Sequence, residues 1–207
     1  MRPYAIGITG PSGSGKTELA VRVQAELEDA TLLSLDSYYL SQDHLSLEER
    51  ELLNFDDPKM LDWPLVVEQI SRLVSGAAID HPIYSFEKHT RVAETIRVEP
   101  SRWLIIEGIF ALHHAELREL YGAKFYVTAP DEVCLERRIE RDVVSRGRTR
   151  ESVVRQYDAT VRPSAELHIL PTERFADMTV SGVQPIDHSV STTVAFLKSA
   201  RAAGRGK

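Results

Sequence analysis

The segment Gly10–Thr17 has the residue types and the spacing of a loop that binds phosphate groups. It reads Gly-Pro-Ser-Gly-Ser-Gly-Lys-Thr and matches the pattern G-x-x-x-x-G-K-S/T. Glycines let such a loop turn tightly, so that successive backbone N–H groups point inward at an anion. The lysine reaches the outer phosphates, and the final hydroxyl is a ligand for Mg²⁺. We therefore predict that the chain binds a nucleoside triphosphate through Gly10, Ser12, Gly13, Ser14, Gly15, Lys16 and Thr17.

The residues that flank this loop predict the elements that position it. Tyr4–Thr9 is an apolar run typical of a buried strand, and apolar residues recur at helical spacing after Lys16. Bound phosphates would then lie at a helix N-terminus, where the helix dipole favours anions. The alternative is a glycine-rich turn with a chance lysine, and both flanks argue against it.

Two acidic residues follow two other apolar runs, Thr31–Leu35 and Trp103–Ile106. Ligands of open parallel sheets bind at the carboxyl ends of the strands, so we expect Asp36 and Glu107 to face the phosphate loop. We predict that Asp36 accepts the proton of the hydroxyl that is phosphorylated, and that Glu107 and Thr17 form the Mg²⁺ site, directly or through water. The alternatives are a helix N-cap for Asp36 and, for Glu107, a helix cap or a partner of the loop lysine.

An arginine-rich segment spans residues 136–150 and reads Glu-Arg-Arg-Ile-Glu-Arg-Asp-Val-Val-Ser-Arg-Gly-Arg-Thr-Arg. On a helix over 131–146, its arginines and glutamates form separate stripes, whereas a helix built for internal ion pairs would alternate the signs. Because the planar guanidinium grips phosphate oxygens at two points, we predict a lid that closes on the phosphates. Arg138 and Arg141 would act in catalysis together with Lys16, and Arg146 would bind the nucleotide.

Leu135, Ile139 and Val143 recur at helical spacing in this segment and predict the apolar face of the lid helix. Gly147 follows the helix and is a candidate hinge. The alternative for the whole segment is a solvated charged helix, or an anchor for the acidic face of a partner.

The composition limits the classes of protein to consider. The chain has 207 residues, of which 43% are hydrophobic, with one cysteine and a net charge of −6. This length suits one globular domain. A single cysteine, Cys134, excludes a disulfide framework, and the acidic balance argues against a broad nucleic-acid surface. Trp103–Leu112 is too short to span a bilayer, and we expect no signal peptide, no membrane partner and a cytoplasmic location.

Strand patterns alternate with helical patterns along the chain. We predict an α/β fold, with a P-loop NTPase-type parallel sheet of about five strands flanked by helices. The predicted strands are 4–9, 31–35, 103–106, 124–127 and 177–180, and the predicted helices include 65–74, 131–146 and 151–161, the last stopped by Pro163. Extended pieces at 81–84 and 95–98 predict an inserted β-hairpin lobe over about residues 80–99. The lid covers about 131–150 of a single domain over 1–200, and 201–207 would be a flexible tail.

The order of these motifs resembles that of the uridine–cytidine kinases. The segments that carry the resemblance are the phosphate loop, Leu35–Tyr39, Asn54–Pro58, Pro82–Arg91, Ile106–Ile109, Arg137–Asp142, Arg146–Arg148 and Ala176-Asp177. They cover about residues 4–182. Single motifs are shared with phosphoribulokinases and pantothenate kinases, whereas Asn-Phe-Asp together with Tyr-x-Phe-x-x-His-x-Arg is more specific to nucleoside kinases.

The resemblance implies Mg²⁺-dependent transfer of the γ-phosphate of ATP or GTP to the 5′-hydroxyl of uridine or cytidine. It agrees with Asp36 as the catalytic aspartate and with Thr17 and Glu107 at the metal. It also implies a homo-oligomer, commonly a tetramer, and a set of nucleoside contacts. These are Asp56 on the ribose 2′- and 3′-hydroxyls, Tyr84 and His89 on the pyrimidine edge, Phe55 and Phe86 against the base, and Arg138, Arg148 and Gln156 around the nucleoside.

The chain departs from the family pattern at Asp57–Leu61 and at Ser85, both close to the predicted nucleoside lobe. Two alternatives therefore stay open. One is a kinase of another small alcohol, such as a sugar phosphate or pantothenate. The other is a nucleotide-dependent regulatory protein, although the chain has no Asn-Lys-x-Asp segment of the kind that reads guanine in GTPase switches.

Overall fold

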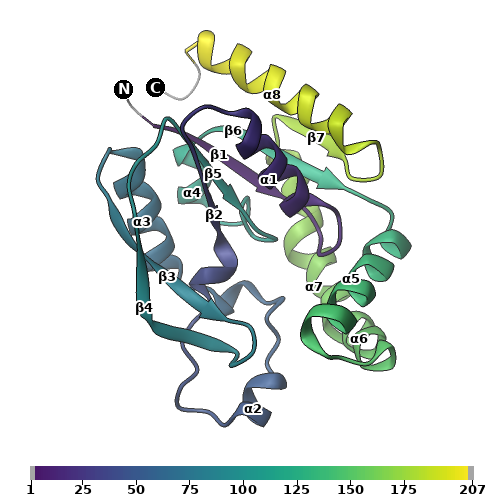
Figure 1. The fold of residues 1–207 in the computed structure, drawn as a ribbon. Coiled ribbons are helices and arrows are strands. Elements are labelled where there is room, and N and C mark those ends of the chain that lie inside the picture. Colours follow the sequence, from purple (N-terminus) through teal and green to yellow (C-terminus); the bar gives the residue numbers. More distant parts are fainter. Residues whose placement is uncertain (1–2, 205–207) are drawn as a thin grey trace.

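A parallel sheet forms the centre of the molecule. The computed structural model describes residues 3–204, and within them five strands pair in the order β2-β5-β1-β6-β7 (Figure 1). All of these pairings are parallel. The strands are β1 (Tyr4–Thr9), β2 (Ala30–Ser34), β5 (Trp103–Glu107), β6 (Tyr121–Thr128) and β7 (Met178–Ser181). The predicted α/β fold with about five parallel strands is confirmed, and each predicted strand overlaps an observed one.

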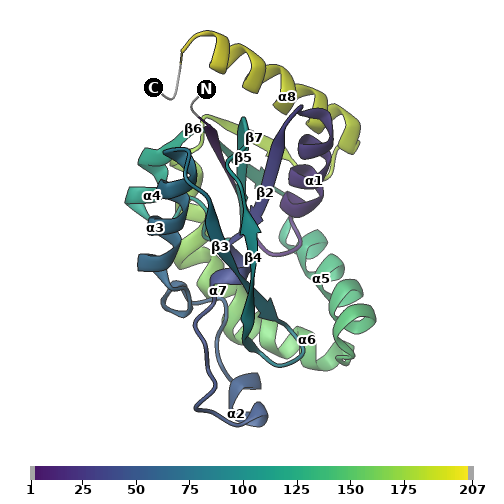
Figure 2. The same ribbon diagram turned by 60° about the vertical axis from the view of Figure 1, so that its left-hand side comes forward.

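Helices cover both faces of this sheet (Figures 1 and 2). On one face α1 (Lys16–Glu26) and α8 (Ile186–Ala202) pack in a core that includes Ile6 of β1. On the other face α3 (Trp63–Val74) and α4 (Ala115–Leu120) pack in a core that includes its neighbour Ala5. Alternate residues of one strand thus enter opposite cores, which explains why the strand sequences are continuous apolar runs.

The inserted segment forms an antiparallel hairpin, β3 (Ile79–Ser85) and β4 (Thr90–Val98). Figure 2 shows it beside the main sheet, with α2 (Leu47–Glu51) near its tip. Arg50 of α2 donates a hydrogen bond to the carbonyl of Lys88 in the hairpin turn, at 3.0 Å. The hairpin predicted from the extended pieces is therefore present, and it is longer than those pieces.

The helical segments after β6 are α5 (Asp131–Arg146), α6 (Arg150–Gln156) and α7 (Arg162–Ser164). The prediction that Pro163 stops the helix after residue 161 is wrong, because the chain stays helical through it. A π-helical turn over Tyr157–Val161 precedes α7, and Pro163 lies in the first turn of α7. Proline is tolerated in a first turn, where its missing N–H costs no helical hydrogen bond.

The carboxyl end of the described chain is more ordered than the predicted tail. α8 includes Arg201 and Ala202, and the Arg201 guanidinium lies 4.6 Å from the ring centre of Trp103. Ala203 and Gly204 form a turn after α8, and residues 205–207 of the predicted tail lie outside the described residues. Between residues 3 and 204, no helix combines the length and the apolar character needed to cross a membrane.

Candidate active site

The register of the sheet brings the phosphate loop and two carboxylates to one edge. Glu107 is the last residue of β5, and it lies opposite Ile8 of β1 and Ser34 of β2. The phosphate loop begins just beyond Ile8, and Asp36 follows just beyond Ser34. The prediction that Asp36 and Glu107 lie at the carboxyl edge of the sheet, with the phosphate loop, is confirmed.

The phosphate loop is tightly packed, and its polar groups could bind an anion. Gly13 has a φ of +84°, and a Cβ at this position would lie 2.2 Å from the carbonyl oxygen of Cys134 in α5. Gly15, with a φ of +97°, caps α1. Lys16 is buried, and among residues 3–204 the buried hydroxyl of Ser14 has no hydrogen-bond partner. A buried hydroxyl without a partner is costly unless a ligand completes it, so the loop fits a phosphate group.

Thr17 and Glu107, the two predicted metal ligands, are in contact. The Thr17 hydroxyl donates a hydrogen bond of 3.0 Å to Glu107 Oε2, and Glu107 is only 4% exposed. The structure therefore gives Glu107 a partner at Thr17 rather than an ion pair with the loop lysine. In the described part of the chain, no cluster of three or more acidic, histidine or cysteine side chains could hold a metal. Such a pair fits Mg²⁺, which usually takes one or two protein oxygens and completes its shell with phosphate oxygens and water.

Asp36 lies in a 3₁₀ turn, Leu35–Tyr38, whose N-cap is Ser34. The alternative that Asp36 itself is an N-cap is therefore wrong. Burial and the nearby Glu107 carboxylate raise the pKa of Asp36 to about 6, against the opposite effect of Lys16. Glu107 of the predicted metal site and Lys16 of the phosphate loop are thus among the charged groups near Asp36.

The raised pKa of Asp36 predicts a pH dependence. A carboxyl group accepts a proton only when it is ionised, and Asp36 ionises as the pH rises through about 6. We therefore expect kcat/KM to fall below this pH and to stay level just above it, since kcat/KM reports the groups of the free enzyme. A pH profile of kcat/KM checks this, and an acid limb at the ordinary aspartate value of 3.8 would contradict it.

Arg138 links the phosphate loop to the predicted nucleoside residues. Its side chain is 7% exposed and lies 3.6 Å from Asp56 Oδ1. It donates hydrogen bonds of 3.1 Å to the Ser12 hydroxyl and 3.3 Å to Gln156 Oε1. Within the described residues its Nε has no hydrogen-bond acceptor. This Nε lies 3.6 Å from Asp142 Oδ2, an ion-pair distance, so it faces a buried carboxylate of the lid.

The other predicted lid arginines gather on a residue that the sequence analysis did not select. Arg141, Arg146 and Arg148 each form an ion pair with Asp142, at 2.8, 3.5 and 3.5 Å. Arg148 also hydrogen-bonds to Gln156 Oε1. The structure thus joins the lid arginines in one cluster, and Asp142 could have been noticed from its place in the Arg-Arg-x-x-Arg-Asp motif.

The prediction of an apolar face along the lid helix is wrong in part. Val143 is 41% exposed. The buried residues of α5 are Cys134, Arg138, Ile139 and Asp142. The helix therefore turns the Arg138–Asp142 pair inward and leaves Val143 on the surface.

Aromatic rings line the other side of the site. The ring of Phe55 stacks on that of His89 at 5.5 Å, and it lies 6.3 Å from Tyr84. Tyr84 contacts Phe86 at 5.2 Å, and the Arg146 guanidinium lies 4.8 Å from the centre of the Phe86 ring. The structure thus brings the four predicted aromatic residues together, and the lid touches the hairpin through Phe86.

Tyr39 belongs to this aromatic cluster and was not predicted. Its ring lies 5.4 Å from Phe55 and 5.3 Å from Tyr84. Its hydroxyl donates a hydrogen bond to the Phe55 carbonyl. Burial raises the pKa of Tyr39 well above its ordinary value, and nearby Asp36 and Asp56 add to this effect. Tyr39 therefore joins the rings predicted to bind the base and lies near Asp36, the predicted proton acceptor.

Asp56 is buried, and the hydroxyl of Ser164 donates a hydrogen bond to its carbonyl. The next turn is capped by Asp57, whose side chain accepts a hydrogen bond from Lys59 N. The departure from the family pattern at Asp57 is therefore compatible with an ordinary turn cap, and it leaves the Asp56 carboxylate facing Arg138.

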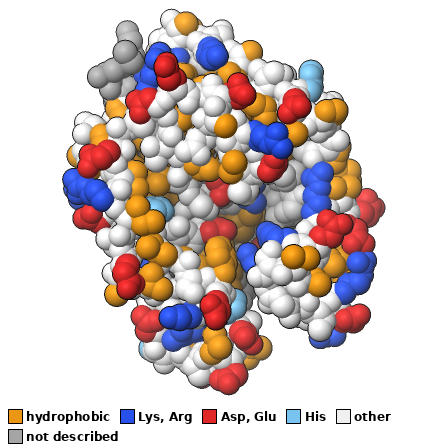
Figure 3. All heavy atoms as spheres, in the orientation of Figure 1, with side chains coloured by type: hydrophobic (Ala, Val, Ile, Leu, Met, Phe, Trp, Pro, Cys, Tyr) orange, Lys and Arg blue, Asp and Glu red, His pale blue; other side chains and the backbone are white. Residues whose placement is uncertain are grey.

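A cavity of about 320 Å³ lies beside the phosphate loop. It is lined in part by Gly15, Leu19, Arg137, Gly182 and Ile186. Its volume is within the range of small-molecule sites. On the face shown in Figure 3, a groove also runs between the side that carries the hairpin and the side that carries α5 and α6, with both basic and acidic side chains visible in it.

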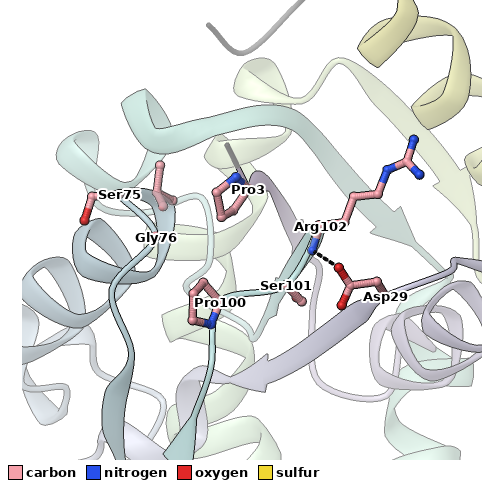
Figure 4. Close-up of a pocket in the computed structure, with 8 residues that line it drawn as sticks. Pro3, Asp29, Ser75, Gly76, Pro100, Ser101 and Arg102 are labelled. Carbon is pink, nitrogen blue, oxygen red and sulfur yellow. Dashed lines mark hydrogen bonds between the residues drawn. The ribbon is translucent and has the colours of Figure 1, made fainter. Parts of the chain in front are cut away.

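A larger hollow of about 800 Å³ lies elsewhere (Figure 4). It is lined by residues that include Ser75, Pro100 and Arg102, and the backbone N–H of Arg102 donates a hydrogen bond to Asp29 at 2.8 Å. Because β5 begins just after Arg102, this hollow lies at the amino ends of the strands, opposite the phosphate loop. We therefore do not assign it to the active site.

Comparisons with known proteins show the family to which this chain, with its phosphate loop and hairpin, belongs. A family model described as Phosphoribulokinase / Uridine kinase family matches residues 5–189. The chain belongs to this family. The resemblance seen in the sequence motifs is thus confirmed at the level of the phosphoribulokinase/uridine kinase family, whose members act as kinases with a nucleotide as phosphate donor.

Individual members of the phosphoribulokinase/uridine kinase family are similar over most of their length. A uridine kinase from Lactobacillus johnsonii is 43% identical over 182 residues, which are 86% of this chain and 86% of that protein. A uridine kinase from Streptococcus agalactiae is 39% identical over 202 residues, which are 95% and 96% of the two chains. A solved structure of phosphoribulokinase from Rhodobacter spheroides covers 87% of this chain and 70% of that one, with a TM-score of 0.62. At 17% identity that structure shows a shared fold alone.

Proposed function

We propose that this protein transfers the γ-phosphate of ATP or GTP to the 5′-hydroxyl of uridine or cytidine. The observation that carries the proposal is the position of Arg138, between Ser12 of the phosphate loop and Asp56 at the aromatic cluster. A donor phosphate and an acceptor ribose would meet there. The names of the similar uridine kinases support the choice of acceptor.

Each of the predicted catalytic and donor-binding residues has a role in this proposal. Asp36 orients the acceptor hydroxyl and accepts its proton, a task that is largely positioning in a loose phosphoryl transition state. Lys16, Arg138 and Arg141 stabilise the charge on the group in transfer, and Arg146 binds the donor. Thr17 and Glu107 would hold Mg²⁺, which when bound neutralises charge on the outer phosphates.

The acceptor would lie among the aromatic residues. Phe55 and Phe86 pack against the base, and Tyr84 and His89 read its edge, while Arg148 and Gln156 complete the surroundings. Tyr84 supports this role, because within the described residues its buried hydroxyl has no hydrogen-bond partner. The donor base would occupy the cavity of about 320 Å³ beside Gly182.

The test is an ADP-release assay with Mg²⁺·ATP across a panel of acceptors. The panel contains uridine, cytidine, their 2′-deoxy forms, pantothenate and ribulose 5-phosphate. We expect turnover with uridine and cytidine far above that with the other acceptors. Preferred turnover with a non-nucleoside acceptor, or slow hydrolysis that no acceptor stimulates, would overturn the proposal.

Replacing Asp56 by alanine should weaken ribonucleoside binding selectively. A carboxylate that accepts two hydroxyl hydrogen bonds contributes more to a ribonucleoside than to its 2′-deoxy form, so we expect the KM for uridine to rise about 10- to 100-fold. Steady-state kinetics with uridine and 2′-deoxyuridine measure this. The matched control is Asp57→Ala, which removes the neighbouring turn cap and should leave the ratio of the two kcat/KM values unchanged. Equal losses for both substrates in Asp56→Ala would disprove the ribose assignment.

A further inference from the structure

Asp142 is the most completely buried carboxylate of the lid, with 0% of its surface exposed. Four arginine side chains form ion pairs with it. They are Arg138 at 3.6 Å, Arg141 at 2.8 Å, Arg146 at 3.5 Å and Arg148 at 3.5 Å. One negative charge thus lies at the centre of four positive charges.

The backbone of Asp142 also shapes the lid. Its carbonyl accepts a hydrogen bond from the N–H of Gly147, the C-cap of α5. It accepts a second from the N–H of Arg148, at 3.2 Å. The same residue therefore holds the turn that ends α5 and the guanidinium groups on either side of that turn.

Three of these arginines have a second contact in the active site. Arg138 reaches the Ser12 hydroxyl of the phosphate loop. Arg146 reaches the Phe86 ring of the hairpin, and Arg148 reaches Gln156. Asp142 itself has no predicted contact with either substrate. It connects the arginines that face both substrates.

The charges explain why one carboxylate has this effect. Guanidinium groups repel one another at short range, and without a counter-charge they would separate into solvent. A buried carboxylate is stable only when it is paired, so the burial of Asp142 depends equally on the arginines. The pairing keeps the arginines in one arrangement before any phosphate is present.

We propose that Asp142 is a positioning residue, which arranges Arg138, Arg141, Arg146 and Arg148 for phosphoryl transfer. The inference rests on the proposed function. The lid should affect nucleotide affinity and turnover in different ways. Affinity for a triphosphate depends on the total positive charge, whereas turnover depends on where the charges lie. Loss of the carboxylate should therefore reduce turnover without reducing nucleotide affinity.

The experiment compares Asp142→Asn with the wild type, well below the melting temperature of each protein. We expect kcat for uridine to fall about 30-fold or more, as misplacement of catalytic groups does. We expect the Kd of Mg²⁺ with a non-hydrolysable ATP analogue to stay within about threefold, or to tighten, because all four guanidinium charges remain. A loss of kcat below about tenfold, or a tenfold or greater weakening of the analogue, would overturn the proposal.

Glu136→Gln is the matched control. Glu136 lies on the same helix and pairs with Arg150, but both side chains are more than half exposed. Loss of an exposed ion pair costs little, so we expect its kcat and Kd to match the wild type. A loss of kcat in Glu136→Gln equal to that in Asp142→Asn would show a general effect of lid ion pairs and would overturn the specific role.

A second variant covers the case in which Asp142→Asn does not fold. Arg141→Gln together with Asp142→Asn removes one charge of each sign and keeps the net charge of the cluster. Compared with Arg141→Gln alone, we expect a further loss of kcat of about tenfold, with the analogue Kd unchanged. A further loss below about threefold would overturn the proposal. Failure of the wild type to phosphorylate any nucleoside would instead count against the proposed function, so the two failures are distinct.

Discussion

Asp36→Asn is expected to lower kcat by about 10²- to 10⁴-fold, the range for loss of a general base. Asparagine has nearly the same shape as aspartate but cannot accept the proton of the acceptor hydroxyl. The acceptor would still be bound by Asp56 and the aromatic residues, and the donor by the phosphate loop. The loss should therefore fall on kcat and leave both KM values within a few-fold of the wild type.

Nucleotide binding gives the second measurement for Asp36→Asn. The variant removes a negative charge that lies close to Glu107 and the donor site. Donor affinity should therefore be unchanged or higher, as measured with a non-hydrolysable ATP analogue. Asp80→Asn is the control, because Asp80 is an exposed hairpin residue paired with Arg97. If Asp36→Asn retains more than about a tenth of the wild-type kcat, Asp36 is not the base.

Gly182→Ala is expected to disable donor binding. A Cβ at Gly182 would lie 1.8 Å from the carbonyl oxygen of Ser14, which is backbone and cannot rotate away. Gly182 is also held by its N–H, which donates to the Thr128 carbonyl at 2.8 Å. Because both sides of the contact are fixed, the phosphate loop must shift, and we expect kcat/KM for ATP to fall about 10²-fold.

The same substitution should also lower stability, since overpacking costs about 1–3 kcal/mol. Thermal melting with and without Mg²⁺·ATP separates the two effects, because lost donor binding removes the ligand-induced rise in Tm. Gly76→Asn is the control. A Cβ at Gly76 would meet no described atom within 4 Å, so this variant shows the effect of a substitution at a positive φ far from the phosphate loop and should leave ATP binding unchanged. If Gly182→Ala binds ATP as the wild type does, the close contact is not what positions the loop.

The parts of the site that lie close together in the sequence could be predicted from it. The phosphate loop is one contiguous pattern, so its residue types alone identify it. Asp36 and Glu107 were found by a rule about strand ends, which needs only the order of the strands. The aromatic cluster was found by resemblance, since neither Phe55 nor His89 has a local signal that separates binding from packing.

The remaining features depend on tertiary contacts that a local pattern does not contain. In a sequence, a carboxylate next to arginines is typical of a surface ion pair, so the local pattern does not indicate that Asp142 is buried. The apolar residues of α5 predicted which side of the helix faces inward. In the structure the buried Arg138–Asp142 pair lies on the inward side, and Val143 is exposed. Pro163 was expected to stop a helix, because the sequence does not reveal the π-helical turn that precedes it.

The tight contact between the phosphate loop and the first turns of α5 limits how the enzyme can open and shut. The Cys134 carbonyl occupies the space beside Gly13, and Arg137 donates a hydrogen bond to the Gly13 carbonyl at 3.3 Å. If α5 swung as one rigid rod, its backbone would collide with the loop or drag it along. A lid movement that keeps these contacts would therefore pivot beyond Arg137 and would move only the far end of the helix and the turn at Gly147.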